Sequence, residues 1–110
     1  MNHFKLEGLP LEPFKTEGSQ KAYTKMLLGE EGQAPSLRII KLEPGGRTGS
    51  HAHKRAHLAI ALRGKVSVKE EGGSLTLNPL EGLFIEPYRP HSFANPWGEP
   101  ALLLVFNVEG

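Results

Sequence analysis

The chain has 110 residues, with 13 basic and 12 acidic side chains, a formal net charge of +1 and no cysteine. This length predicts a single domain, and the lack of thiols excludes disulfides and thiolate metal sites. The basic residues are scattered and form no run, so nucleic acid and anionic membranes are not expected partners. No apolar segment resembles a secretory signal or a membrane span, and we expect a cytoplasmic location.

Glycine and proline divide the chain into many short apolar runs. The 13 glycines and 9 prolines are spread between these runs, which favours short strands joined by tight turns over a disordered linker. Residues 1–20 show no clear period and are predicted to form an N-terminal arm, followed by a single domain at residues 21–110. Strands are predicted at residues 22–28, 36–42, a stretch ending at 51–53, 57–62, 66–68, 74–77, 83–85, 92–94 and 101–108.

This pattern favours an all-β fold. No segment has the caps and the period of a helix. Residues 36–42 carry apolar side chains on both faces, so we expect this strand to be buried on both sides. Residues 101–108 form the longest apolar run and are predicted to be a central strand. Short antiparallel strands with hairpin turns predict a double-sheet jelly roll.

Three of the five histidines lie close together, at His51, His53 and His57. Residues two apart on an extended strand point to the same face, so His51 and His53 can aim both rings at one point. Residues 54–56 are long enough for a tight turn, after which a returning strand could bring His57 to that point. Neutral imidazole is a good ligand for divalent transition metals, which makes this a candidate metal site. The alternative is a set of solvated histidines, because the turn between them is basic.

The stretch from Gly45 to Gly64 resembles the first motif of the cupin superfamily, which runs G-x5-H-x-H-x3or4-E-x6-G. Gly45, His51, His53 and Gly64 fall on this pattern. His57 stands where the commoner form has glutamate. The stretch is therefore similar to that of small single-domain cupins of the four-histidine type.

A second stretch resembles the second cupin motif, which has an apolar strand, a proline, a turn, Pro-His, and an asparagine four residues after the histidine. Pro87, Pro90, His91 and Asn95 match it. The opening Gly-Asp of the motif is inverted and displaced, and the usual turn glycine is replaced near Tyr88–Arg89. The two motifs imply a double-stranded β-helix, the jelly-roll barrel of the cupin fold.

The resemblance implies one divalent transition metal ion per chain, held by His51, His53, His57 and His91, without distinguishing Mn, Fe, Ni, Zn or Cu. Four neutral ligands leave the ion its full charge, which favours an anionic oxygen such as an enolate or a carboxylate. An alternative is a three-histidine site with His57 pointing away. The long apolar run at 101–108 and the unplaced N-terminal arm predict a homodimer, as is common among cupins, with the arm crossing to the partner's sheet.

Four further residues are candidates for lining a substrate pocket, and no catalytic residue can be assigned. Ala59 and Ala61 share a strand face with His57 and would leave room for a ligand, or would fit a crowded core. Glu86 lies close to the last histidine in sequence and could orient its ring or act on substrate, unless it is a solvated loop residue. Phe93 could line the pocket or belong to the core. The candidate lining residues are Ala59, Ala61, Phe93 and Glu86.

The leading hypothesis is a metal-dependent enzyme acting on a small oxygen-chelating organic substrate. The resemblance includes relatives with dioxygenase-like and polyketide-cyclase or isomerase-like activities. The cupin fold hosts many unrelated functions, so two alternatives remain: a non-catalytic metal-dependent binder of small molecules, and a structural cupin with a vestigial site. Dioxygen uptake with a chelating diketone or phenol separates the enzyme from both alternatives. Metal analysis separates the structural cupin with a vestigial site from the other two.

Overall fold

The computed structural model describes residues 1–50, 52 and 54–108, and in this part of the chain it contains β-strands and no helix. The strands are β1 (Glu12–Pro13), β2 (Gln20–Leu28), β3 (Ser36–Arg47), β4 (Ala56–Arg63), β5 (Val66–Glu70), β6 (Gly73–Leu77), β7 (Gly82–Ile85), β8 (His91–Ala94) and β9 (Ala101–Val108). The predicted all-β class is confirmed. The described residues accordingly include no helix long and apolar enough to cross a membrane.

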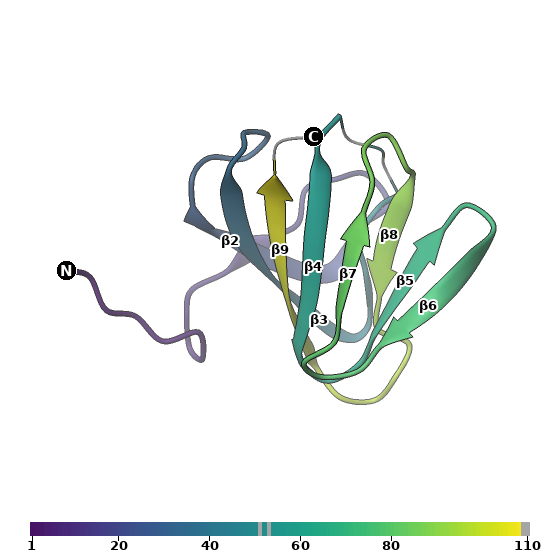
Figure 1. Ribbon diagram of the computed structural model, residues 1–110. Helices are drawn as coiled ribbons and strands as arrows, with labels where there is room; N and C mark the ends of the chain where they lie inside the picture. The colour runs from purple at the N-terminus through teal and green to yellow at the C-terminus, as the bar shows by residue number, and fades with distance from the viewer. Residues whose placement is uncertain (51, 53, 109–110) are drawn as a thin grey trace.

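The strands form two layers packed face to face (Figure 1). The larger layer has the order β1-β2-β3-β9-β4-β7, the smaller layer has the order β8-β5-β6, and every pairing is antiparallel. β3 belongs to both layers: residues 36–42 pair with β2 and β9, and Arg47 pairs with Ala94 of β8. This arrangement is the jelly-roll barrel that the strand pattern predicted.

The bend of β3 between the two layers lies at two adjacent glycines. Gly45 adopts a φ of 82°, and a β-carbon on Gly46 would collide with the carbonyl oxygen of Lys21. The bend is tied to the end of β8, because Gly45 N donates to the carbonyl oxygen of Asn95 and Asn95 N donates to that of Gly46, both at 2.8 Å. The sequence predicted a turn here after a strand ending at residue 42. Instead the strand continues to Arg47, since glycine lets the chain bend without ending its pairing.

The apolar core lies between the two layers and follows the two-residue alternation of the strands. On β9, Ala101, Leu103 and Val105 are buried, and the residues between them are partly exposed. From the smaller layer, Val66 and Val68 of β5 face them as fully buried residues. The core cluster comprises Ala22, Ile40, Leu42, Ala59, Ala61, Val66, Val68, Leu77, Ile85, Phe93, Ala101, Leu103 and Val105.

Candidate metal and ligand site

One end of the barrel is polar on its inner face. The inward rows of β3, β4 and β9 are apolar in the middle of the barrel and carry Arg38, His57 and Asn107 toward this end. His57 and Asn107 are direct partners across β4 and β9, and Arg38 pairs with Val105, the preceding inward residue of β9. The strand register therefore brings three polar side chains to one end of the fold.

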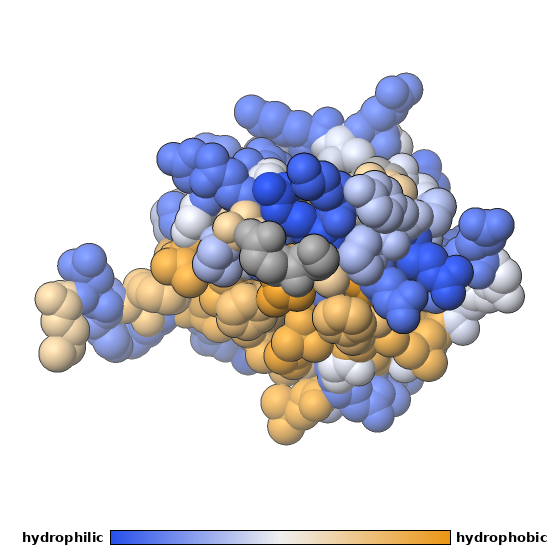
Figure 2. Space-filling view, turned by 45° about the horizontal axis from the view of Figure 1, so that its top comes forward, coloured by the Kyte–Doolittle hydropathy of each residue, from blue (hydrophilic) through white to orange (hydrophobic). Residues whose placement is uncertain are grey.

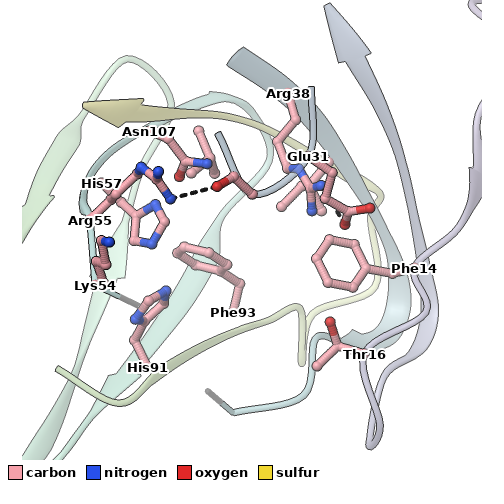
Figure 3. Close-up of a pocket in the computed structure, with 13 residues that line it drawn as sticks. Phe14, Thr16, Glu31, Arg38, Lys54, Arg55, His57, His91, Phe93 and Asn107 are labelled. Carbon is pink, nitrogen blue, oxygen red and sulfur yellow. Dashed lines mark hydrogen bonds and ion pairs between the residues drawn. The ribbon is translucent and has the colours of Figure 1, made fainter. Parts of the chain in front are cut away.

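His57 and His91 meet across the barrel. His57 belongs to β4 of the larger layer and His91 begins β8 of the smaller layer, and the two residues are only 5% and 3% exposed. Their ring centroids lie 5.1 Å apart with an interplanar angle of 63°. Both rings line the same cavity (Figure 3). Two of the four predicted metal ligands, from distant parts of the sequence, therefore face one space.

The turn before β8 orients the ring of His91. Its Nδ1 atom lies 2.9 Å from the carbonyl oxygen of Arg89. A carbonyl can only accept a hydrogen bond, so Nδ1 carries a proton, and in the neutral ring Nε2 then has the lone pair that a metal would take. Within the turn, Tyr88 has a φ of 64°, a conformation that favours glycine. This is the position at which the sequence motif lacks its usual turn glycine.

The other two predicted ligands, His51 and His53, lie outside the described residues, as does most of the strand end predicted there. The chain just before them is fastened to β8, the strand that carries His91. Thr48 N donates to the carbonyl oxygen of Phe93 at 2.9 Å, and Phe93 N donates to Thr48 Oγ1 at 3.0 Å. Within the described residues, no three His, Cys, Asp or Glu side chains form a group that could hold a metal ion.

The four residues predicted to line a pocket fall into two groups. Phe93 lies on the cavity wall, with its ring centroid 5.7 Å from that of His91. Ala59 and Ala61 are 0% exposed and belong to the core cluster, so they occupy the packed interior rather than the described cavity wall. Glu86 follows β7 as an exposed residue and does not lie on the described wall.

The cavity has a volume of about 180 Å³, which compares with the roughly 150 Å³ of engineered cavities that hold benzene. Figure 3 shows His57 and His91 on one side of it, and Arg38 with Phe14 on the other. Basic side chains outnumber acidic ones on the described part of the wall, which favours an anionic ligand. The charged lining residues there are Arg38, Lys54, Arg55 and Glu31.

Among the ion-paired cations of the described residues, Arg38 is the most enclosed. Its Nη2 atom lies 2.8 Å from Oε1 of Glu31, and the two side chains are 16% and 79% exposed, respectively. Its guanidinium carbon lies 5.1 Å from the ring centroid of Phe14, a cation–π distance. The hydrogen bond and the charge of Arg38 lower the pKa of Glu31 below its ordinary value of 4.5; partial burial opposes this, and the charge of Lys15 adds to it.

Sequence reasoning missed several residues of the wall: Arg38, Glu31, Asn107, Phe14, Lys54 and Arg55. Arg38 and Asn107 had a signal, because each is a polar residue at an inward position of an otherwise apolar strand. Glu31 had none, since it lies in the connection between β2 and β3, where it pairs with Arg38 at the cavity wall.

The chain matches a family model described as a cupin domain over residues 38–107. A search of curated proteins gives no match. The matched region includes β4, β8 and all but the last residue of β9, and therefore His57 and His91.

Several solved structures share the fold. The polyketide cyclase RemF from Streptomyces resistomycificus superposes with a TM-score of 0.83 at 23% identity, covering 99% of this chain and 80% of that one. A cupin 2 conserved barrel domain protein from Salinispora arenicola gives a TM-score of 0.81 at 16% identity, covering 100% and 90%. A predicted oxalate decarboxylase from Thermotoga maritima gives 0.78 at 19% identity, covering 91% and 94%.

Proposed function

Because the chain belongs to the cupin domain family, we propose that it is a small metal-dependent enzyme acting on an oxygen-chelating organic substrate. The observation that carries this proposal is the pair of buried imidazoles, His57 and His91, whose rings lie 5.1 Å apart on the wall of one cavity. Buried polar side chains that share a cavity with charged groups are a common mark of functional sites.

The donor chemistry fits a divalent transition metal ion. His57 and His91 would hold it together with His51 and His53, and the protonated Nδ1 of His91 leaves Nε2 as the ligand atom. The contact of His91 with the Arg89 carbonyl fixes the ring orientation, as such contacts do for metal-bound histidines. A bound ion would supply Lewis acidity and open positions for substrate oxygens.

The remaining wall suits a small, partly aromatic anion. Phe14 and Phe93 offer apolar faces, and Lys54 and Arg55 add positive charge near the histidines. These residues would orient a substrate, exclude water from its apolar part and balance its negative charge. Among proteins of similar fold are a polyketide cyclase and a predicted oxalate decarboxylase, which is consistent with a carbonyl- or carboxylate-bearing substrate.

The test begins with untagged protein, whose metal content is measured by elemental analysis. We expect close to one transition-metal ion per chain. Dioxygen consumption and product formation are then followed with acetylacetone and with catechol, and we expect turnover of at least one of them to be lost in His57→Ala and His91→Ala. His3→Ala is the matched control, since His3 lies in the exposed N-terminal segment. Protein that carries no metal and takes up none on reconstitution would overturn the proposal.

Metal binding without turnover of any chelating compound would instead identify a metal-dependent binder.

A further inference from the structure

The connection between β2 and β3 closes one side of the cavity. It runs over residues 29–35, and its side-chain contact with the cavity wall is the pair of Glu31 and Arg38 at 2.8 Å. Arg38 lies on β3 with its guanidinium above the Phe14 ring and its Nη2 atom 3.4 Å from Sδ of Met26. The cation is thus fixed in place by the protein, whatever its partner.

Two backbone contacts hold the same connection. The carbonyl oxygen of Gly32 accepts a hydrogen bond from Nη1 of Arg55, and that of Gln33 accepts one from Nδ2 of Asn107 at 3.4 Å. Arg55 and Asn107 also line the cavity. All three contacts therefore tie this loop to residues that a cavity ligand would touch.

The two side chains of the ion pair differ in exposure, and this difference decides which of them can leave. The Arg38 side chain is 16% exposed and the Glu31 side chain is 79% exposed. An exposed carboxylate returns to water with little loss of free energy, whereas a guanidinium enclosed by a phenyl ring and a thioether loses much of its hydration and needs an anion beside it. Glu31 is the exchangeable partner and Arg38 is the fixed one.

We infer that Arg38 recognises the carboxylate of an organic acid, and that Glu31 occupies this position only while the cavity is empty of ligand. The inference rests on the proposed function, because the other end of the ligand then lies toward His57 and His91 on the opposite side of the cavity (Figure 3). A guanidinium can bind a carboxylate through two parallel hydrogen bonds. Binding displaces Glu31 and removes one of the three contacts that hold the loop.

The behaviour of Glu31 supports this assignment. The hydrogen bond and charge of Arg38 lower the pKa of its carboxyl group, so the place beside Arg38 already stabilises a negative charge. Lys54 and Arg55 on the same wall increase the attraction for an incoming anion.

The experiment compares salicylate with salicylamide, which has the same ring and phenol and replaces the carboxylate with a neutral amide. Dissociation constants are measured by ligand-observed NMR on the full chain after metal removal with EDTA, and again on metal-loaded protein. We expect salicylate to bind about tenfold more tightly than salicylamide in both preparations, a size typical of one charged hydrogen-bonding contact.

Variants assign the preference to the ion pair. Arg38→Gln should abolish it, and Arg38→Lys should retain part of it, because lysine keeps the charge and loses the planar fork. Glu31→Gln should strengthen salicylate binding several-fold and leave salicylamide unchanged, since it removes the competing carboxylate. Glu31 is exposed, so this variant keeps the fold and tests the inference even if Arg38→Gln is unstable. Arg63→Gln is the matched control: Arg63 forms an exposed pair with Glu7.

The inference would be overturned if Arg38→Gln still preferred salicylate over salicylamide. It would also be overturned if neither wild type nor Glu31→Gln bound salicylate. The two preparations keep it separate from the proposed function. If the protein never binds metal but shows an Arg38-dependent preference for salicylate, the proposed metal-dependent function fails and the carboxylate site stands. If metal-loaded protein shows no such preference, the carboxylate site fails and the proposed function stands.

Discussion

The imidazole ring of His57 packs edge to face against that of His91, with 5.1 Å between the centroids, although the two residues come from different layers of the barrel. Their distance is set by backbone pairing through β4, β9, β3 and β8. Because both residues are buried, a substitution at either one acts on the cavity and not on the outer surface.

The first prediction concerns the role of His57. His57→Ala should weaken metal binding roughly tenfold or more, the size seen for disrupted metal shells, and His91→Ala should be at least as damaging. His57→Glu should retain the metal, because a carboxylate can ligate from the same position. Affinities are measured by competition with a chromophoric chelator, with His3→Ala as the control. Equal affinities for wild type, His57→Ala and His57→Glu would remove His57 from the coordination sphere.

The second prediction concerns the pH dependence of stability. Since Arg38 lowers the pKa of Glu31 in the folded chain, ionised Glu31 stabilises the fold above the unfolded value of about 4.5, and this contribution is lost as the pH falls through the lower folded value. The contribution is small, because the carboxylate is largely exposed.

Urea unfolding of wild type and Glu31→Gln should therefore differ slightly and constantly above about pH 5 and converge at lower pH. Glu30→Gln, at the neighbouring exposed position, serves as the control for the loss of one surface charge. A difference between wild type and Glu31→Gln that grows on acidification would contradict the assigned ion pair.

The third prediction concerns Tyr88. Its φ of 64° places the backbone in the left-handed region, which costs about 1 kcal/mol for a residue other than glycine, and the residue is 70% exposed. Tyr88→Gly should raise the free energy of unfolding by up to about 1 kcal/mol. Tyr88→Ala, which keeps the β-carbon, should leave it almost unchanged. Denaturant titration decides between them, and a destabilised Tyr88→Gly protein would show that the tyrosine ring contributes more than the backbone strain.

The fourth prediction concerns the bend of β3. Gly46→Ala should destabilise the fold by about 1–3 kcal/mol, a range typical of overpacking, because its β-carbon would meet the Lys21 carbonyl oxygen. Gly73→Ala is the matched control, since a β-carbon there meets nothing within 4 Å. Thermal unfolding of the two variants provides the comparison, and equal melting temperatures would mean that the neighbouring backbone yields without loss.

The fifth prediction concerns assembly. We propose that two copies pair through the outer face of the larger layer, where Leu58 lies opposite Phe106 and Ile60 lies opposite Leu104 as partly exposed pairs. Figure 2 shows apolar residues gathered over one region of the surface, and Phe84, which pairs with Leu58, is 55% exposed. Continuous apolar surface of this kind marks interaction sites.

Light scattering at micromolar concentration should give the mass of two chains for wild type and of one chain for Phe84→Glu. Leu75→Glu is the control, because Leu75 is 49% exposed on β6 of the smaller layer. The N-terminal segment reaches away from the barrel (Figure 1), and we expect it to contact the partner. A wild-type protein with the mass of one chain would overturn this proposal.

The fold could be predicted from the sequence because alternation and turn residues are local signals. The inward and outward rows of 57–62 and 101–108 follow directly from the order of residues. The length of β3 could not be predicted in this way: the pair Gly45 and Gly46 is typical of a turn, and only the approach of Lys21 and Asn95 shows that the strand passes through it.

The described histidines of the candidate site were predictable because two sequence motifs carry them. His57 and His91 belong to two spaced motifs, whereas the Glu31–Arg38 pair depends on how the loop after β2 folds back onto β3. Ala59 and Ala61 share the inward face of His57, but the opposite layer packs against them, so they lie in the core. The spacing of residues along a strand predicts which face a side chain lies on. How deep it lies within the barrel depends on how the strands pair and the layers pack.

The passage of β3 through both layers has a consequence for how the molecule can fluctuate. Amide protons at Gly45, Thr48 and Asn95 are bonded across the junction of the layers, so their exchange with solvent requires the barrel itself to open. Amides in the 29–35 connection can exchange through local opening, because few contacts hold that segment. Deuterium uptake should therefore be slow at the junction of the two layers and fast in the 29–35 connection beside the cavity. We expect the 29–35 connection to open locally while the junction of the layers, which positions His57 and His91, stays closed.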